Sequence, residues 1–319
     1  MHPSHQASIS RLITQGFIRR GAIRSYPSTA LICSFSKPTS KSPCLLRHDD
    51  VVTLFHELGH GIHDMVSKTL CARFHGSVGT VVDFGEAPSQ MLENWCWIPS
   101  QLKALSRHYS TLSEDYKKAW QEKMTLQGDS TEVPDPQISD EMLGQLLKAR
   151  GVNQALAHLN QLSIAIFDFT VHDPTSHNAM EEMDISKTFN HLKREIWPIE
   201  TPWDIGEGDD WGHQHSEYRS LVVGDYSAGY YAYTLYCTIL FVSSLKTNLL
   251  ILLSPRSSIY SADMFDTFFR SDPTNSAAGR RYRHELLEKG GSQPEMDTLL
   301  AYLGRQPSPV ALYKEMGLE

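Results

Sequence analysis

The sequence predicts a mainly helical globular protein with little β-strand. Apolar residues recur at three- and four-residue intervals in four stretches, residues 49–68, 101–125, 138–168 and 180–197, which is the spacing of an amphipathic helix. Hydrophobic residues make up 40% and charged residues 21% of the 319 residues. These values are those of ordinary soluble domains, so the composition argues against a disordered, collagen-like or coiled-coil chain.

The first predicted helix covers residues 49–68. Its apolar positions are Val51, Val52, Leu54, Phe55, Leu58, Ile62 and Met65. Asp49 and Asp50 stand at its start, where the positive end of the helix dipole favours carboxylates. The pattern therefore predicts both the helix and its N-terminus.

The segments after this helix alternate between turns and further helices. Residues 71–84 contain two glycines and three valines (Gly76, Gly79, Val78, Val81 and Val82), which predict a turn with a short extended piece. Pro88 suits the first turn of a second helix, which is expected to run through Met91, Leu92 and Trp95. Residues 127–137 and 201–213 are predicted loops because they are rich in glycine, proline or acidic residues.

One long apolar segment departs from this pattern. Residues 235–253 approach the length of a membrane span but contain Lys246 near their middle. A central lysine costs roughly 3 kcal/mol on membrane-insertion scales. We therefore expect a buried helix or an aberrant insertion here, with a single membrane span as the less favoured alternative.

Charge and cysteine content restrict the partners and the compartment. The formal net charge is −8, which gives no sign of a nucleic-acid partner. The five cysteines form no CxxC pair, so a reducing compartment such as the cytoplasm is expected. Residues 1–48 contain seven Lys or Arg and no Asp or Glu. This composition favours a basic surface segment, with a mitochondrial presequence as the alternative.

The chemistry is concentrated in the HExxH sequence of His56, Glu57 and His60, inside the first predicted helix. Histidines four residues apart lie on one helix face, so both imidazoles can reach a single tetrahedral Zn²⁺. Glu57 is placed to take the proton of a water beside the metal and to pass it to a leaving amine. This pattern is typical of a metalloprotease.

A third metal ligand is needed, and spacing alone leaves two candidates. Glu86 and Glu93 are seven residues apart, which puts both near one face of the following helix. His63 is a further histidine one turn beyond His60. We expect it to pack in the core or to support a metal ligand without touching the metal, because catalytic zinc usually has three protein ligands and one open position.

These motifs resemble the thimet oligopeptidase, saccharolysin and mitochondrial intermediate peptidase family of zinc metallopeptidases. The resemblance rests on FHELGHGIHD (55–64) and DFGEAPSQMLENWCW (83–97). It implies one Zn²⁺ held by His56, His60 and Glu86, with Glu57 as the general base. The implied fold is a zincin-type helical catalytic domain with a small β region, and the implied activity is endopeptidase cleavage of short oligopeptides by a monomer.

Other segments extend the resemblance over most of residues 25–319. SYPSTALICSFSKP (25–38) resembles the strand region beside the catalytic helix, and QALAHLNQLSIAIFD (154–168) resembles a later core helix. GDYSAGYYAY (224–233) resembles a glycine- and tyrosine-rich substrate loop. The resemblance implies that Tyr230 and Tyr233 stabilise the oxyanion, and that Tyr226, Gly224 and Gly229 bind substrate.

The sequence departs from the family pattern in three places. The family's chains are about twice as long, so the N-terminal half of their two-lobed channel is expected to be lacking. Ser220 or Leu221 stands where the family has a histidine before the tyrosine loop, and residues 236–257 resemble an insertion. We therefore expect a poorly defined N-terminus at 1–24 and a catalytic domain at 25–319. The alternative function is a truncated, zinc-binding but catalytically impaired fragment.

Overall fold

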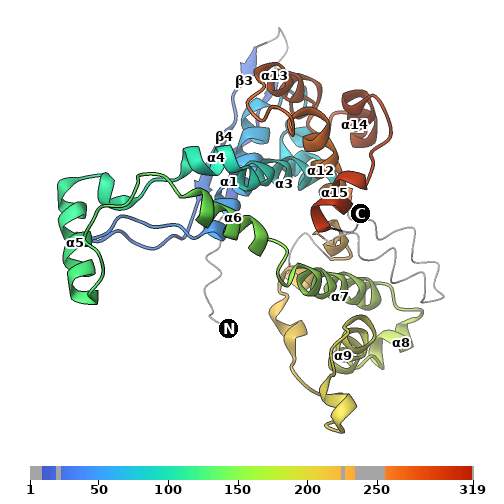
Figure 1. Ribbon diagram of the computed structural model, residues 1–319. Coiled ribbons are helices and arrows are strands. Elements are labelled where there is room, and N and C mark those ends of the chain that lie inside the picture. Colours follow the sequence, from blue (N-terminus) through green and yellow to red (C-terminus); the bar gives the residue numbers. More distant parts are fainter. Residues whose placement is uncertain (1–8, 19–22, 224–226, 234–255, 318–319) are drawn as a thin grey trace. The chain divides into compact units, whose positions relative to one another are not determined.

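The computed structural model describes residues 9–18, 23–223, 227–233 and 256–317. Helices predominate among them, as the sequence predicts (Figure 1). The helices are α1 (His48–Val66), α2 (Val82–Gly85), α3 (Ala87–Glu93), α4 (Pro99–Leu105), α5 (Glu114–Gln127), α6 (Asp140–Ala149), α7 (Gln154–His172), α8 (His177–Glu181), α9 (Ile185–Ile196), α10 (Ser220–Val223), α12 (Arg256–Phe268), α13 (Ser276–Glu285), α14 (Glu295–Leu303) and α15 (Val310–Met316). The strands are β1 (Ile9–Thr14), β2 (Phe17–Ile18), β3 (Arg24–Ser25) and β4 (Ser28–Ile32).

The chain divides into two compact units. The first unit contains residues 1–80, 88–150 and 264–307, and the second contains residues 81–87, 151–263 and 308–319.

In the first unit, the strands accompany the long helix α1. β1 pairs antiparallel with β4, with Ile9 opposite Ile32, and β2 pairs antiparallel with β3. Both β1 and β4 contact α1, which lies beside them in Figure 1. β4 lies within residues 25–38, the segment for which the resemblance implies strand.

The start of α1 follows from its first-turn carboxylates. Asp49 and Asp50 occupy that turn, and the Asp50 carboxylate accepts a hydrogen bond of 2.9 Å from the backbone N–H of Arg47. The helix begins one residue before the predicted range and ends two residues inside it. The periodicity and the capping residues together therefore predicted this element closely.

Aromatic side chains form part of the core of the first unit. The Trp95 ring meets the rings of Phe265 and Phe269 edge to face, with centroids 4.9 Å and 5.0 Å apart. The indole N–H of Trp95 donates to the carbonyl of Pro273 at 2.9 Å. The partly buried indole thus has its polar group satisfied, and it joins the segment after α3 to the C-terminal helices.

The second unit is organised around α7, which lies beside α9 (Figure 1). Buried apolar residues of these two helices form two clusters, the second of which includes one residue of α10: Leu162, Ile166 and Ile196, and Ile164, Phe167, Phe189 and Leu221. Because α7 contributes to both clusters, this single helix supplies much of the unit's apolar core.

Several predicted elements differ in detail from the structure. The extended piece expected in residues 71–84 is wrong, because that segment forms two 3-10 turns followed by α2. Gly76 has φ of 64°, a left-handed conformation that suits glycine and breaks an extended run. The helical stretches at 101–125 and 138–168 are each divided into two helices.

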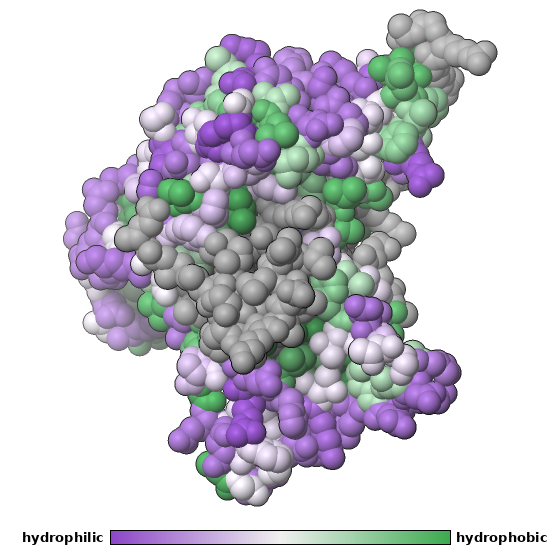
Figure 2. Space-filling model, turned by 90° about the vertical axis from the view of Figure 1, so that its right-hand side faces the viewer, coloured by the Kyte–Doolittle hydropathy of each residue, from purple (hydrophilic) through white to green (hydrophobic). Residues whose placement is uncertain are grey.

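The membrane-like segment 235–253 lies outside the described residues. Among the residues that the structure describes, no helix is long and apolar enough to cross a membrane. On the face drawn in Figure 2, hydrophilic side chains predominate among the coloured residues and the hydrophobic ones gather in small groups. Large apolar residues on the described surface include Leu70, Leu126 and Val222.

Candidate metal and peptide site

Helix α1 presents the two histidines of the HExxH sequence on one face. The rings of His56 and His60 meet edge to face, with centroids 4.9 Å apart. Glu57 is partly buried on the same helix, one residue after His56. The four-residue spacing therefore produces the paired imidazoles that the sequence predicts.

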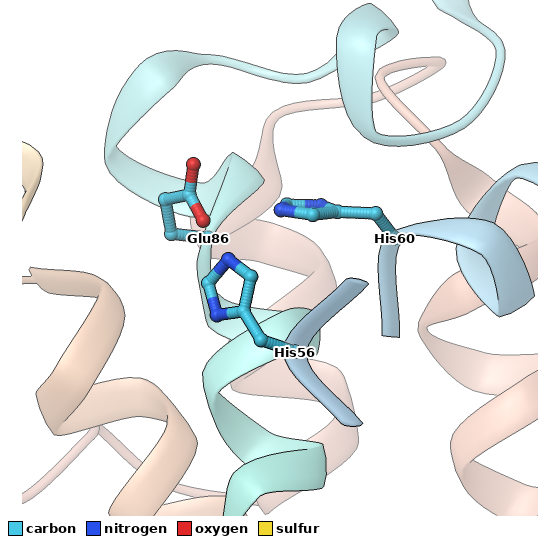
Figure 3. A group of neighbouring side chains, drawn as sticks. All are labelled: His56, His60 and Glu86. Atoms are coloured by element: carbon cyan, nitrogen blue, oxygen red, sulfur yellow. The ribbon is translucent and has the colours of Figure 1, made fainter. Parts of the chain in front are cut away.

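Glu86 joins these histidines from a different segment. It directly follows α2 and is 6% exposed. One ligand atom each from His56, His60 and Glu86 lie within 4.8 Å of one another, and Figure 3 shows the three side chains pointing toward one another. Zinc–ligand bonds of about 2.0–2.2 Å hold ligand atoms about 3.4 Å apart in a tetrahedral site. Small side-chain rotations would bring these three donors to that separation.

The predicted helical position of Glu86 needs a correction. The sequence put Glu86 and Glu93 near one face of a following helix, whereas Glu86 lies in the turn before α3 and Glu93 is the last residue of α3. Only Glu86 of the two belongs to the group of three.

Glu93 lies against one of the histidines. Its Oε1 accepts a hydrogen bond of 2.6 Å from Nδ1 of His56. Because Nδ1 carries the proton in this pair, Nε2 is the nitrogen that a metal would take, and the carboxylate fixes the orientation of the ring.

Glu93→Ala is expected to weaken zinc binding by about 10–100-fold, the usual cost of removing the partner of a metal-binding histidine. Competition with a chelator of known affinity measures the change. Glu181→Ala is the matched control, because it breaks another histidine–glutamate pair, that of His177 and Glu181 at 3.2 Å on the exposed surface of α8. Equal zinc affinity in both variants would contradict this role for Glu93.

Gly59 allows α1 to approach α3 closely. A Cβ at this position would lie 2.5 Å from the Cα of Ser89 and 2.9 Å from the carbonyl oxygen of Pro88. Both are backbone atoms two or three residues after Glu86, so they cannot move aside as a side-chain end would. The absence of a side chain at Gly59 thus allows the close approach of α1 to Pro88 and Ser89 of α3.

Gly59→Ala is therefore expected to lower the free energy of unfolding by about 1–3 kcal/mol, the usual cost of overpacking. Urea denaturation measures it. Gly144→Ala in α6 is the matched control, because nothing lies within 4 Å of a Cβ there, and removing a helical glycine stabilises by about 0.5–1 kcal/mol. If both variants were stabilised alike, the close approach at Gly59 would carry no energetic weight.

His63 is not part of the group of three. It is fully buried on α1, and neither ring nitrogen has a hydrogen-bond partner among the described residues. Burial, together with nearby His60 and His75, lowers the pKa of His63 to about 3. The ring is therefore neutral at physiological pH, an environment that suits the packing role expected from the sequence.

The tyrosine-rich loop is described in part. Tyr230 begins the 3-10 turn Tyr230–Tyr233, which contacts α2 in the second unit. Its hydroxyl donates to Oε1 of Gln161 at 2.8 Å, and burial raises its pKa to about 12. The phenol is thus a neutral donor at pH 7, and Gln161 is its acceptor in this structure.

The other predicted loop residues are placed less fully. Gly229 is buried. Gly224 and Tyr226 lie outside the described residues, as does the side chain of Tyr233. The resemblance implies a histidine at Ser220 or Leu221. Leu221 belongs to the apolar cluster around Phe189 and offers no donor, and the side chain of Ser220 lies outside the described residues.

Two polar residues on α7 were missed by the sequence reasoning. Asp168 accepts hydrogen bonds from the backbone of the tyrosine loop, and Gln161 accepts one from Tyr230. A signal was available, because Asp168 is a charged residue within the apolar run IAIFDFTV of a core helix. Such a residue is almost never fully buried unless it is paired.

The sequence matches the model of a known protein family. The chain matches Peptidase family M3 over residues 4–248 and 256–318. The short gap in that match, residues 249–255, falls inside the predicted insertion at 236–257.

Almost the whole of this chain aligns with curated relatives. Saccharolysin of Saccharomyces cerevisiae is 35% identical over 308 residues, which cover 96% of this chain and 36% of saccharolysin. Thimet-like oligopeptidase of Dictyostelium discoideum is 30% identical, covering 95% of this chain and 37% of its own. Oligopeptidase A of Escherichia coli is 30% identical, covering 92% and 35%. The chain thus spans about a third of the length of these relatives.

Proposed function

Because the chain belongs to peptidase family M3, as the resemblance predicted, we propose that it is a zinc-dependent metalloendopeptidase acting on internal bonds of short peptides. The family and the oligopeptidase relatives support a peptide substrate. The substrate and the activity are proposals for this chain, which spans about a third of each relative.

One observation carries the proposal, the mutual proximity of His56, His60 and Glu86 within 4.8 Å. Two imidazoles and a carboxylate are a known donor set of catalytic zinc, which keeps a fourth position for water or substrate. These three residues would hold one ion per chain. When bound, zinc supplies Lewis-acid polarisation of the scissile carbonyl and acidifies water at neutral pH.

Glu57 acts as the general base in this proposal. Its carboxylate accepts the proton of the attacking water and then delivers that proton to the leaving amine. The place of Glu57 in the HExxH sequence, between the two histidines on α1, supports this role.

The tyrosine loop stabilises the oxyanion and binds the peptide. Tyr230 and Tyr233 are the proposed oxyanion donors, and Tyr226, Gly224 and Gly229 the proposed substrate-binding residues. The neutral phenol of Tyr230 supports such a role, because it can donate a hydrogen bond without adding charge. To act as an oxyanion donor, the Tyr230 hydroxyl must leave Gln161 and donate its hydrogen bond to the substrate oxygen instead.

A second candidate function is zinc binding with impaired turnover. It is favoured by Leu221, which is buried in the core near the position of the family's histidine, and by the hydroxyl of Tyr230, which donates to Gln161. Losing one oxyanion donor costs about 10²–10³-fold in kcat.

Hydrolysis of a short internally quenched peptide by the purified chain, alongside its zinc content, distinguishes the two candidates. Turnover that a chelator abolishes supports the peptidase. Tight binding of one zinc without turnover supports the impaired form, and the absence of zinc binding would contradict both candidate functions.

We further propose that the chain is a monomer in the cytoplasm, with mitochondria as the alternative location. Nucleic acid is not an expected partner.

A further inference from the structure

Asp168 is a buried carboxylate that the proposed mechanism does not use. It lies on α7 with an exposed fraction of 0%, between the buried Phe167 and the partly buried Phe169. An ionised carboxylate in such surroundings is costly unless hydrogen bonds satisfy it. Its partners therefore indicate what it holds.

Two of these partners are backbone groups of the tyrosine loop. Oδ1 of Asp168 accepts the N–H of Ala228 at 3.0 Å, and Oδ2 accepts the N–H of Tyr230, also at 3.0 Å. The third is His172, one helical turn later, whose Nδ1 lies 2.9 Å from Oδ1. The carboxylate thus binds two amides that are sixty residues away in the sequence.

The loop backbone has an unusual conformation between these two amides and needs an external support. Ala228 has φ of 54°, in the left-handed region that non-glycine residues seldom adopt. Backbone N–H groups around a left-handed residue form a concave anion-binding nest. The Asp168 carboxylate occupies the position of the anion, so it stabilises the backbone conformation directly.

Helix α7 holds Tyr230 at a second point. Gln161 lies two turns before Asp168 and accepts the hydroxyl of Tyr230 at 2.8 Å. The same helix therefore fixes the main chain of Tyr230 through Asp168 and its phenol through Gln161. When the Tyr230 hydroxyl leaves Gln161, the hydrogen bond to Asp168 still fixes the position of the Tyr230 main chain.

We infer that Asp168 is a positioning residue, whose two hydrogen bonds to the loop at Ala228 and Tyr230 fix where the Tyr230 hydroxyl meets the substrate. The inference rests on the proposed function. It goes beyond that function by assigning to a residue of the helical core the control of the loop geometry.

Asp168→Asn tests this assignment with little change of shape. An amide has a single acceptor oxygen, and its NH₂ group would face one of the two loop N–H groups. We expect amide hydrogen exchange at Ala228 and Tyr230 to accelerate by about tenfold or more. We also expect kcat to fall by about tenfold or more with KM little changed, the pattern of an interaction that matters in the transition state. Zinc content should stay as in the wild type.

Asp263→Asn is the matched control. Asp263 is 3% exposed in the second unit, and its carboxylate accepts a backbone N–H, that of Ser308, at 2.8 Å. Losing this charge is expected to lower stability but to leave loop exchange and kcat unchanged. An equal fall in kcat in both variants would mean a general loss of stability and would overturn the inference.

Two further results would also overturn it. In the wild type, the amides of Ala228 and Tyr230 should exchange at least about 100-fold more slowly than in an unstructured peptide, and fast exchange would refute the hydrogen bonds even if Asp168→Asn does not fold. Faster loop exchange in Asp168→Asn with unchanged kcat would refute the positioning role. A wild type without hydrolysis would instead refute the proposed function, while exchange would still decide whether Asp168 holds the loop.

Discussion

Glu57→Gln is expected to lower kcat for peptide hydrolysis by about 10²–10⁴-fold, the usual contribution of a general base. The amide is close in size to the carboxylate, but it cannot accept the proton of the attacking water. Because Glu57 is not one of the three proposed ligands, zinc content should remain at one ion per chain. Steady-state kinetics with a quenched peptide, together with metal analysis, measure both quantities.

The control for this substitution is Glu122→Gln on α5, where the carboxylate is exposed and lies 3.9 Å from Lys41. Its kcat and zinc content should match those of the wild type. If Glu57→Gln kept more than a tenth of the wild-type kcat, another residue would have to supply the base. If the variant lost its zinc, the lower rate would reveal nothing about proton transfer and Glu57 would need a structural role.

His60→Ala is expected to have the largest effect on metal binding. It removes one of the three proposed protein ligands, so the loss of zinc affinity should exceed the 10–100-fold that removal of an outer partner such as Glu93 costs. After dialysis the variant should contain almost no zinc, and peptide hydrolysis should disappear with it. Metal analysis after dialysis measures the zinc content, and an assay with the quenched peptide measures the rate of hydrolysis.

His177→Ala is the matched control, because His177 also lies on a helix and contacts a glutamate, but on the surface at α8. It should retain one zinc per chain. A His60→Ala protein that kept its zinc would show that the ion is bound elsewhere, and the group formed by His56, His60 and Glu86 would lose its proposed role.

Parts of this account could be predicted from sequence because the signals are local. The range of α1 follows from apolar periodicity and from Asp49 and Asp50 in its first turn. The pairing of His56 with His60 follows from the same helix geometry. Such features depend on residues within a few positions of one another, so the chain itself contains the necessary information.

Other features depend on tertiary contacts and could not be read in the same way. Residues 71–84 contain valines that favour strands, yet Val78 and Val81 are largely exposed and pair with no strand among the described residues. A β-branched residue favours a strand only where a neighbouring strand accepts it. The 3-10 turns around Gly76 and Gly79 formed instead.

The spacing of residues along the chain also does not determine whether Glu86 or Glu93 joins the two histidines. Spacing along the chain left both candidates open, and the family resemblance selected Glu86. The turn before α3 brings the Glu86 carboxylate to the histidines, whereas the end of α3 brings Glu93 to Nδ1 of His56. Asp168 illustrates the same limit, because its role depends on a loop sixty residues away.

The most direct test of the central claim is a zinc titration of the metal-free chain, with peptide hydrolysis followed at each addition. We expect no turnover without metal, a rise in proportion to added zinc, and saturation at one equivalent per chain. Turnover that persists in the metal-free chain would contradict the claim that zinc held by His56, His60 and Glu86 carries out the reaction.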